Sequence, residues 1–210
     1  MNRLLTYLGI AAIGLTLAAS NARSGVDIGL SADDGGIRSF YLAIGDHYRV
    51  PEREVVVVRE RSIPDDQLPV VFFLARYAKV EPGVIVKLRL SGQSWMDIAL
   101  HYHLSPEIFY VQFDHDPGPP FGKAWGHYKK RDRGEWGKIR LADADIVNVV
   151  NLKFVSEHYG CTPAEVVKMR AKGDNFVSIH KQVKANKGQG KKSSSAVADS
   201  DNAKGKGKKK

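Results

Sequence analysis

One spaced pattern occurs twice in this chain and limits what the chain can fold into. An arginine is followed three residues later by glycine, three further on by a large aromatic residue, and three after that by isoleucine. The two copies are Arg89, Gly92, Trp95 and Ile98, and Arg170, Gly173, Phe176 and Ile179. Internal repetition of this kind is typical of a packing unit that one fold uses more than once.

A third, incomplete copy opens at His47 and reaches Arg59, with Ser62 at the position that glycine holds in the other two. Each copy is preceded by a tyrosine and an aliphatic run. We expect the aromatic and isoleucine positions to fill one apolar core, together with two of the preceding tyrosines. The predicted core residues are Trp95, Ile98, Phe176, Ile179, Tyr77 and Tyr159.

Helix-start signals indicate that these units are helical. The stretch Thr162-Pro163-Ala164-Glu165 supplies a capping hydroxyl, a first-turn proline and a third-position glutamate, in the order in which helices begin. The run Val55 to Val58 would by itself favour a strand, because β-branched residues prefer that state. Its counterparts in the other copies follow helix-start signals, so we predict a helix there as well.

These observations predict an all-α protein of short antiparallel helices around one core, built on a repeated helix-turn-helix-like unit. The expected helical domain covers residues 34–183, and a long loop rich in glycine, proline and aromatic residues interrupts it at 113–140. The helices are predicted near 34–47, 52–61, 66–78, 83–91, 94–103, 106–112, 142–158, 164–171 and 174–184.

Residues 1–22 have the three-part layout of a secretory signal peptide. Arg3 precedes an apolar run, and small residues stand at the two positions that a signal peptidase recognises, ending at Ala22. Retention as a membrane anchor is the alternative, but a span needs roughly 20 apolar residues. We expect cleavage after Ala22, a flexible mature N-terminus at 23–33, and a bacterial protein located in the periplasm or secreted.

The net charge of +9 comes from the C-terminal end of the chain. Residues 181–210 hold ten lysines against two aspartates, whereas residues 23–180 hold 21 basic and 21 acidic side chains. From residue 184 onward Val197 is the only large apolar residue, so this stretch cannot bury enough surface to offset the entropy of ordering. We predict a disordered lysine-rich tail at 184–210 that either binds anionic polymers or only solubilises the chain.

Residues Gly92 to Ile108 contain a glycine, a serine, an isoleucine-alanine pair and a later leucine-serine pair. This spacing resembles the helix-turn-helix of sigma factors and resolvases, which implies a DNA-binding role. The matched positions are packing positions, however, and the expected recognition helix offers only Gln112 to base edges and is followed by Asp114 and Asp116. We therefore expect no base-specific DNA binding and keep a nucleic-acid binder as the second alternative function.

The 113–140 loop contains five glycines, three prolines and five aromatic residues. Long loops of this kind often bind ligands, although aromatic side chains can also serve only to fasten a loop to the core. As binding residues we propose four aromatic and four basic side chains, which together suit a sugar, a peptide or an anionic polymer. They are Phe121, Trp125, Tyr128, Lys129, Lys130, Arg131, Arg133 and Trp136.

Catalytic and cofactor signatures are weak in this sequence. His115 and His127 are candidate metal ligands beside the loop acids, but no zinc-type histidine spacing, nucleophile elbow, phosphate loop or dinucleotide motif occurs. Cys161 is the only cysteine and aligns with an apolar position, so we expect a buried thiol and no disulfide. We predict no cofactor and no enzymatic activity, with a metal-assisted hydrolase as the first alternative.

The function that the sequence favours is therefore an exported binding or structural protein of the cell envelope. Its contact surfaces are the 113–140 loop and the basic tail, and its partner is an anionic polymer or another envelope protein. Contact with the membrane is expected only through the signal segment, if that segment is kept.

Overall fold

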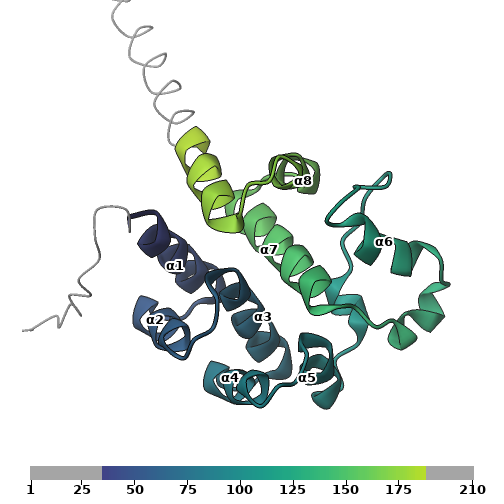
Figure 1. The fold of residues 1–210 in the computed structure, drawn as a ribbon, viewed down its shortest axis with the longest axis horizontal. Coiled ribbons are helices and arrows are strands. Elements are labelled where there is room, and N and C mark those ends of the chain that lie inside the picture. Colours follow the sequence, from purple (N-terminus) through teal and green to yellow (C-terminus); the bar gives the residue numbers. More distant parts are fainter. Residues whose placement is uncertain (1–34, 188–210) are drawn as a thin grey trace, which may run out of the picture.

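The computed structural model describes residues 35–187 (Figure 1). The predicted signal peptide at 1–22, the mature N-terminus at 23–33 and the part of the basic tail after residue 187 lie outside the described residues. Within 35–187 the chain is helical and contains no strand, so the predicted all-α class is confirmed. No helix in this range is long and apolar enough to cross a membrane.

The α-helices are α1 (Gly35–Tyr48), α2 (Glu52–Glu60), α3 (Leu68–Ala78), α4 (Pro82–Leu90), α5 (Trp95–His101), α6 (Gly122–Lys129), α7 (Asp143–Tyr159) and α8 (Pro163–Ala171). Three short 3-10 helices connect them, namely η2 (Asp65–Gln67), η3 (Pro106–Phe109) and η4 (Arg133–Lys138). A last, unlabelled helix begins at Phe176 and continues to residue 187, where the described residues end.

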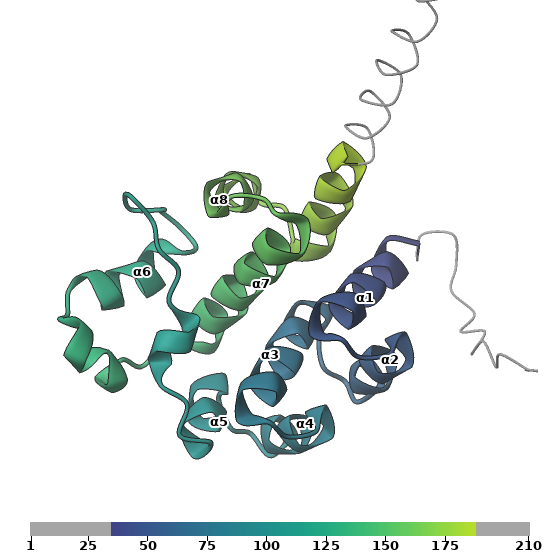
Figure 2. The ribbon, with the colours of Figure 1, turned by 180° about the vertical axis from the view of Figure 1, so that it is seen from behind.

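Helices α3 and α7 form the centre of the molecule, and the other helices pack around them (Figure 1, Figure 2). Every residue of α3 from Leu68 to Ala75 is buried, and α7 buries ten of its 17 residues. Helices α1 and α2 lie at one end of the molecule, while α6 and η4 lie at the other end, as both views show. The two ends therefore present separate surfaces on one shared core.

The valine run is helical, as predicted. It forms the middle of α2, where Val55 and Val58 are buried while Val57 is 46% exposed. A spacing of three residues places the two buried side chains on one face of a helix, whereas a strand would bury alternate residues. Packing of that face against α1 and α3 outweighs the strand preference of valine.

Helices α2, α4 and α8 each contain nine residues and lie between two backbone positions of positive φ. The position before each helix is Arg49, Lys79 or Gly160, and the position after it is Ser62, Gly92 or Gly173. Only Gly92 and Gly173, with φ of 91° and 93°, exceed the usual left-handed helical value. Glycine is favoured at these two turns because it has no Cβ to clash there.

The arginine near the end of each nine-residue helix forms hydrogen bonds that stabilise the connection after that helix. Arg89 donates to the carbonyl oxygen of Gln93 at 2.9 Å and to Oδ2 of Asp143 at 2.6 Å, and its guanidinium lies 4.5 Å from the ring centroid of Trp95. The same side chain therefore satisfies a turn carbonyl, pairs with the first residue of α7 and covers a buried aromatic ring.

Arg170 makes equivalent contacts at the end of α8. Its guanidinium donates to the carbonyl oxygen of Asp174 at 3.0 Å and lies 5.3 Å from the ring centroid of Phe176. Arg59 differs, because it donates to Oδ1 of Asp65 at 2.6 Å. All three guanidinium groups are thus engaged within the fold and do not form a shared ligand surface.

Four of the six residues expected in the core are fully enclosed, namely Trp95, Ile98, Phe176 and Ile179. Tyr159 is only partly buried, and its hydroxyl lies 2.7 Å from Nδ1 of His180. Tyr77 is 46% exposed, so its assignment to the core was wrong. The reason is its place near the C-terminal end of α3, where one face of the helix borders solvent and the Tyr77 ring covers Phe73 at 4.7 Å.

The expected loop at 113–140 contains two helices that we did not predict, α6 and η4. Gly122 and Gly126 disfavour a helix by composition alone. Burial of Phe121, Ala124 and Tyr128 along one side of α6 stabilises it nevertheless. A Cβ at Gly122 would lie 2.8 Å from Oδ1 of the exposed Asp116, so this side chain would have to move if another residue replaced the glycine.

Two predicted boundaries also need correction. The helix expected at 106–112 is only the four-residue η3, since the backbone becomes extended at Tyr110. Residues 184–187, which we placed in the disordered tail, continue the last helix. Val183 is buried there, and Nζ of Lys184 donates to the hydroxyl of Ser39 at 2.6 Å, so contact with α1 holds this turn in place.

We predict that Arg89→Met destabilises the fold by about 1–3 kcal/mol, because the substitution keeps the apolar stem but removes the charged hydrogen bonds and the cation-π contact. Denaturant unfolding of the full chain measures the change. Arg53→Met is the matched control, since Arg53 is exposed on α2 and has no ion pair among residues 35–187. Equal effects of the two substitutions would contradict the role given to Arg89.

Candidate functional site

The predicted binding residues of the 113–140 region divide into buried and exposed groups. Phe121 and Tyr128 are 1% and 4% exposed, and the Tyr128 hydroxyl donates to the carbonyl oxygen of Pro106 at 2.7 Å. Both belong to the apolar side of α6 and pack on the rest of the molecule, so their assignment as ligand-contacting residues was wrong. The surface that remains comes from the other side of α6 and from η4.

Trp125 and Trp136 are both partly buried but have different surroundings. The Trp136 ring lies 4.6 Å from the ring of Tyr110 and 5.1 Å from that of Tyr128, and the guanidinium of Arg133 covers it at 5.3 Å. Trp125 forms no aromatic or cation-π pair among residues 35–187. Trp125 is therefore partly exposed and, unlike Trp136, not engaged by another ring or a guanidinium among the described residues.

The basic side chains of the region are all exposed, in contrast to the two buried aromatics. Arg133 is engaged by Oε1 of Glu107 at 2.6 Å. Lys129, Lys130 and Arg131 form no ion pair with any described residue, although Arg131 donates to a backbone carbonyl of α6. We call residues 121–140 the α6–η4 segment; it holds seven basic and two acidic side chains, whereas the rest of residues 23–180 holds 14 basic and 19 acidic ones.

The weak metal candidates do not come together. His115 is exposed in the connection before α6, and His127 is partly buried on α6. Among residues 35–187 no group of three or more histidine, cysteine, aspartate or glutamate side chains has a metal-binding arrangement. The hydrolase alternative therefore gains no support from the described part of the chain.

The resemblance to a DNA-reading helix-turn-helix also lacks its second helix. The first helix corresponds to α5, whose cap is Ser94 with the backbone amide of Asp97 donating to its hydroxyl. The element that follows is η3, four residues long, with Pro106 and Phe109 buried. A recognition helix has to present several side chains to a groove, and η3 is too short to do so.

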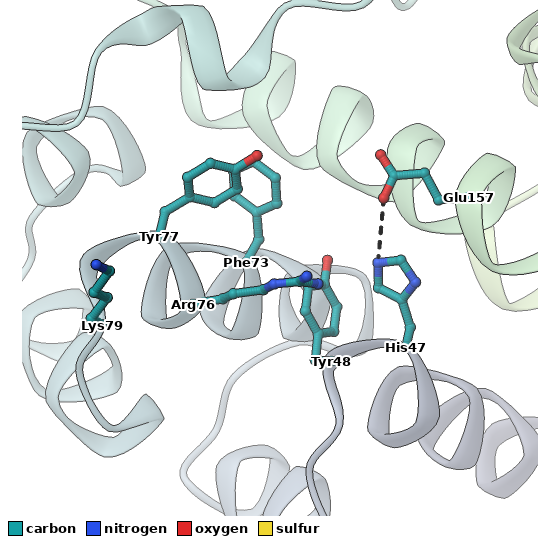
Figure 3. Close-up of a pocket in the computed structure, with 7 residues that line it drawn as sticks. All are labelled: His47, Tyr48, Phe73, Arg76, Tyr77, Lys79 and Glu157. Carbon is teal, nitrogen blue, oxygen red and sulfur yellow. Dashed lines mark ion pairs between the residues drawn. The ribbon is translucent and has the colours of Figure 1, made fainter.

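A pocket of about 390 Å³ lies where α1, α3 and α7 meet (Figure 3). Its walls come from His47 and Tyr48 at the end of α1, four residues at the end of α3, and Glu157 on α7. The residues from the end of α3 are Phe73, Arg76, Tyr77 and Lys79. We did not predict this pocket from the sequence, although tyrosines at the ends of helices could have indicated it.

The pocket has an aromatic interior and a charged rim. Phe73 is buried and Tyr48 and His47 are partly buried, whereas Arg76 and Lys79 are exposed. Glu157 is 61% exposed, and one of its carboxylate oxygens lies 3.6 Å from Nε2 of His47. Figure 3 shows the ring of Tyr77 beside that of Phe73 and the Arg76 side chain extending across the pocket toward Tyr48.

Beside this pocket, α1 and α7 are joined by two equivalent contacts, each between a histidine of one helix and an acidic residue of the other. His47 faces Glu157, and His158 in turn lies 3.8 Å from Oδ2 of Asp46. The two imidazole rings are 6.1 Å apart. Each histidine also meets the tyrosine that follows it edge to face, with centroid distances of 4.6 and 4.5 Å. These contacts give His47 and His158 equivalent packing roles at the ends of their helices.

Three histidines are held neutral near this junction. Burial lowers the pKa of His47 to about 4, and the nearby His158 and Arg76 act in the same direction. Burial likewise lowers the pKa of His180 to about 4 and lowers that of His158. His180 is fully buried, with its two ring nitrogens 2.7 Å from the hydroxyl of Tyr159 and 3.0 Å from that of Ser39.

Cys161 is partly buried beside the last helix, in a second pocket between that helix and α8. Burial raises the pKa of its thiol, so the protonated form predominates at neutral pH. A thiol in this state is a weak nucleophile. The structure thus agrees with a packing role for this side chain more than with a reactive one.

Comparison with known proteins finds no matching family model, no matching curated protein and no matching solved structure. The function of the protein is therefore inferred from the geometry of this chain alone.

The lowered histidine pKa values predict loss of stability in mild acid. An unfolded histidine takes up a proton near pH 6.5, whereas folded His47 and His180 stay neutral down to about pH 4. The unfolded chain therefore binds more protons between these values, so the contribution of these groups is complete above pH 6.5 and falls as the pH drops toward 4. Urea unfolding measured across this range tests the expectation.

His180→Gln isolates one histidine, because glutamine can still donate and accept hydrogen bonds but does not titrate. We expect the stability difference between about pH 7.5 and 4.5 to be smaller in this variant by about 1–3 kcal/mol. His115→Gln, at an exposed position before α6, serves as the control for the loss of one histidine. An unaltered pH dependence in His180→Gln would contradict the neutral, buried state of His180.

Proposed function

We propose that this protein is an exported, non-enzymatic binding protein of the cell envelope that holds an anionic polymer on the α6–η4 segment. The observation that carries the proposal is the set of exposed cations Lys129, Lys130 and Arg131, which have no ion-pair partner among residues 35–187. Adjacent like charges repel one another, so an unneutralised cluster gains free energy when an anion approaches.

The position of the cluster supports a polymer as the ligand. It lies at the end of α6, on the outer side of the molecule and away from α1 and α2 (Figure 1). Neither the pocket between α1, α3 and α7 nor the one beside Cys161 involves these three side chains. An open cationic surface suits a chain of repeated anionic groups better than a single small molecule.

Trp125 adds a surface for sugar or other ring faces near the cations. It stands on α6 four residues before Lys129, so the two side chains lie on neighbouring turns of one face. Its ring is partly exposed and is not used in an aromatic pair among the described residues. Stacking on tryptophan would give a polymer with sugar units additional affinity.

The basic tail would add attraction of longer range. Its nine lysines are spread over residues 184–210, and the described helix that leads into it lies away from α6 (Figure 2). A polyanion that contacts both the tail and the α6–η4 segment would be held at two places, which raises the overall affinity. Export to the envelope, expected from residues 1–22, would bring the protein to such polymers.

We also propose that the helix pairs α1–α2, α3–α4 and α7–α8 are three copies of one packing unit. The equal lengths of α2, α4 and α8 and the positive φ values on either side of them support this. In this view the α6–η4 segment is an insertion between the second and third copies. Its charge can then vary without disturbing the repeated core.

The proposal predicts that the triple substitution Lys129→Gln, Lys130→Gln and Arg131→Gln weakens binding to heparin, used as a sulfated probe polymer. The logarithm of the binding constant should fall less steeply with the logarithm of salt concentration, by a slope of about 2, because three contacts are lost. Affinity at several salt concentrations, measured by fluorescence anisotropy of labelled heparin, provides the slope.

The matched control removes the same charge at three exposed positions on α2, directly after α2 and on α4, by Arg53→Gln, Arg61→Gln and Lys87→Gln. Its salt slope should change by less than half as much. Both triple variants are also measured in a chain that ends at residue 187, which separates the tail from the segment. Equal slopes for the two triple variants in the shortened chain would refute the segment as the binding surface.

A further inference from the structure

We infer that the pocket between α1, α3 and α7 binds a small organic anion with a planar apolar body, of the aromatic carboxylate class. This site is separate from the α6–η4 segment, and the inference does not depend on polymer binding. The volume of about 390 Å³ falls in the usual range for small-molecule sites. The pocket also combines an apolar interior with a few polar groups, as such sites generally do.

The net charge of the pocket rim determines the sign of the charge that a ligand should carry. Arg76 and Lys79 are exposed cations, and neither has an ion-pair partner among residues 35–187. Glu157 is the acid of the pocket, and His47 is neutral at pH 7 because burial lowers its pKa to about 4. The rim therefore carries a net charge of one positive unit, which a single carboxylate would neutralise.

Arg76 is the residue expected to hold the carboxylate. Its guanidinium extends over the pocket in Figure 3, which His47 also lines. A guanidinium presents two parallel N–H groups that match the two oxygens of a carboxylate. Lys79 lies at the opposite side of the pocket in the same view and adds to the positive charge of the rim.

The aromatic interior determines the shape of the rest of the ligand. The rings of Phe73 and Tyr77 form a tilted pair with centroids 4.7 Å apart, and Tyr48 closes the pocket from α1. Tyr77 is 46% exposed, so part of its ring borders solvent. A planar ligand ring placed against Tyr77 would bury its free face and gain offset or edge-to-face stacking.

Phenylacetate is the probe that tests this inference, because it joins one carboxylate to one flat ring. Binding to the full chain is followed by NMR chemical-shift changes during titration. We expect saturable binding with a Kd on the order of 1 mM, with the largest shifts at residues 47, 76, 77 and 157. Three comparison ligands remove one property each: acetate lacks the ring, 2-phenylethanol lacks the charge, and cyclohexylacetate lacks planarity.

Two variants test the assigned roles. Arg76→Gln should weaken phenylacetate binding about tenfold while leaving 2-phenylethanol unaffected, because only the charge-assisted contact is lost. Tyr77→Leu should reduce the preference for phenylacetate over cyclohexylacetate. Both residues are exposed, so the variants should remain folded, which circular dichroism checks. Arg53→Gln on α2 is the control and should bind like the unaltered chain.

Several outcomes would overturn the inference. Absence of saturable phenylacetate binding would show that the pocket is not a site for this class of ligand. Acetate binding as tight as that of phenylacetate would show that the attraction is nonspecific and depends on charge alone. Equal binding by Arg76→Gln would show that this guanidinium does not hold the carboxylate. Polymer binding through the α6–η4 segment would be untouched by each of these results, since heparin binding by Arg76→Gln is measured separately.

Discussion

The contact between a helix-end arginine and the turn that follows it is the interaction on which the arrangement of helices depends. Arg89 and Arg170 each bond a turn carbonyl and cover the aromatic ring that begins the next helix. Arg59 and Arg89 also reach the 3-10 helix η2, through Asp65 at 2.6 Å and Gln67 at 3.4 Å. Burial raises the pKa of Asp66 in the same element, and Arg170 partly opposes that effect. Guanidinium groups from α2 and α4 thus contact one short connection beside the two central helices.

Where α1 meets α7, neutral histidines hold the two helices together, as the arginines do at the helix ends. His47 and His158 lie between aromatic rings, and each faces the acid of the opposite helix. Charged imidazoles would repel one another at this distance and would have to be removed from water, so the neutral forms are favoured. The same packing leaves the ends of α1 and α3 incompletely covered, which is why a pocket forms there. Stability and the proposed ligand site therefore depend on one junction.

The two proposed binding surfaces differ in the physics that would make them selective. The α6–η4 segment offers exposed, closely spaced charge, which attracts any polyanion and weakens as salt screens it. The pocket between α1, α3 and α7 offers few charges and several aromatic walls, so shape would matter there as much as sign. Placement of these surfaces at different parts of the molecule allows each to be altered alone (Figure 1).

The helical class and most helix positions followed from the sequence because capping residues and apolar spacing act locally. Thr162 caps α8 together with Glu165 as its residue type predicts, and the valines of α2 obey their helical spacing. Helix α6 could not be predicted, since glycines at 122 and 126 disfavour it and only burial of its apolar side against other elements stabilises it. Sequence alone thus determined where helices with strong local signals begin and end, and which residues carry charge. Tertiary structure decided that Tyr128 is buried while Tyr77 is exposed, and that His47, Arg76 and Glu157 share one pocket, because both depend on contacts between residues far apart in the chain.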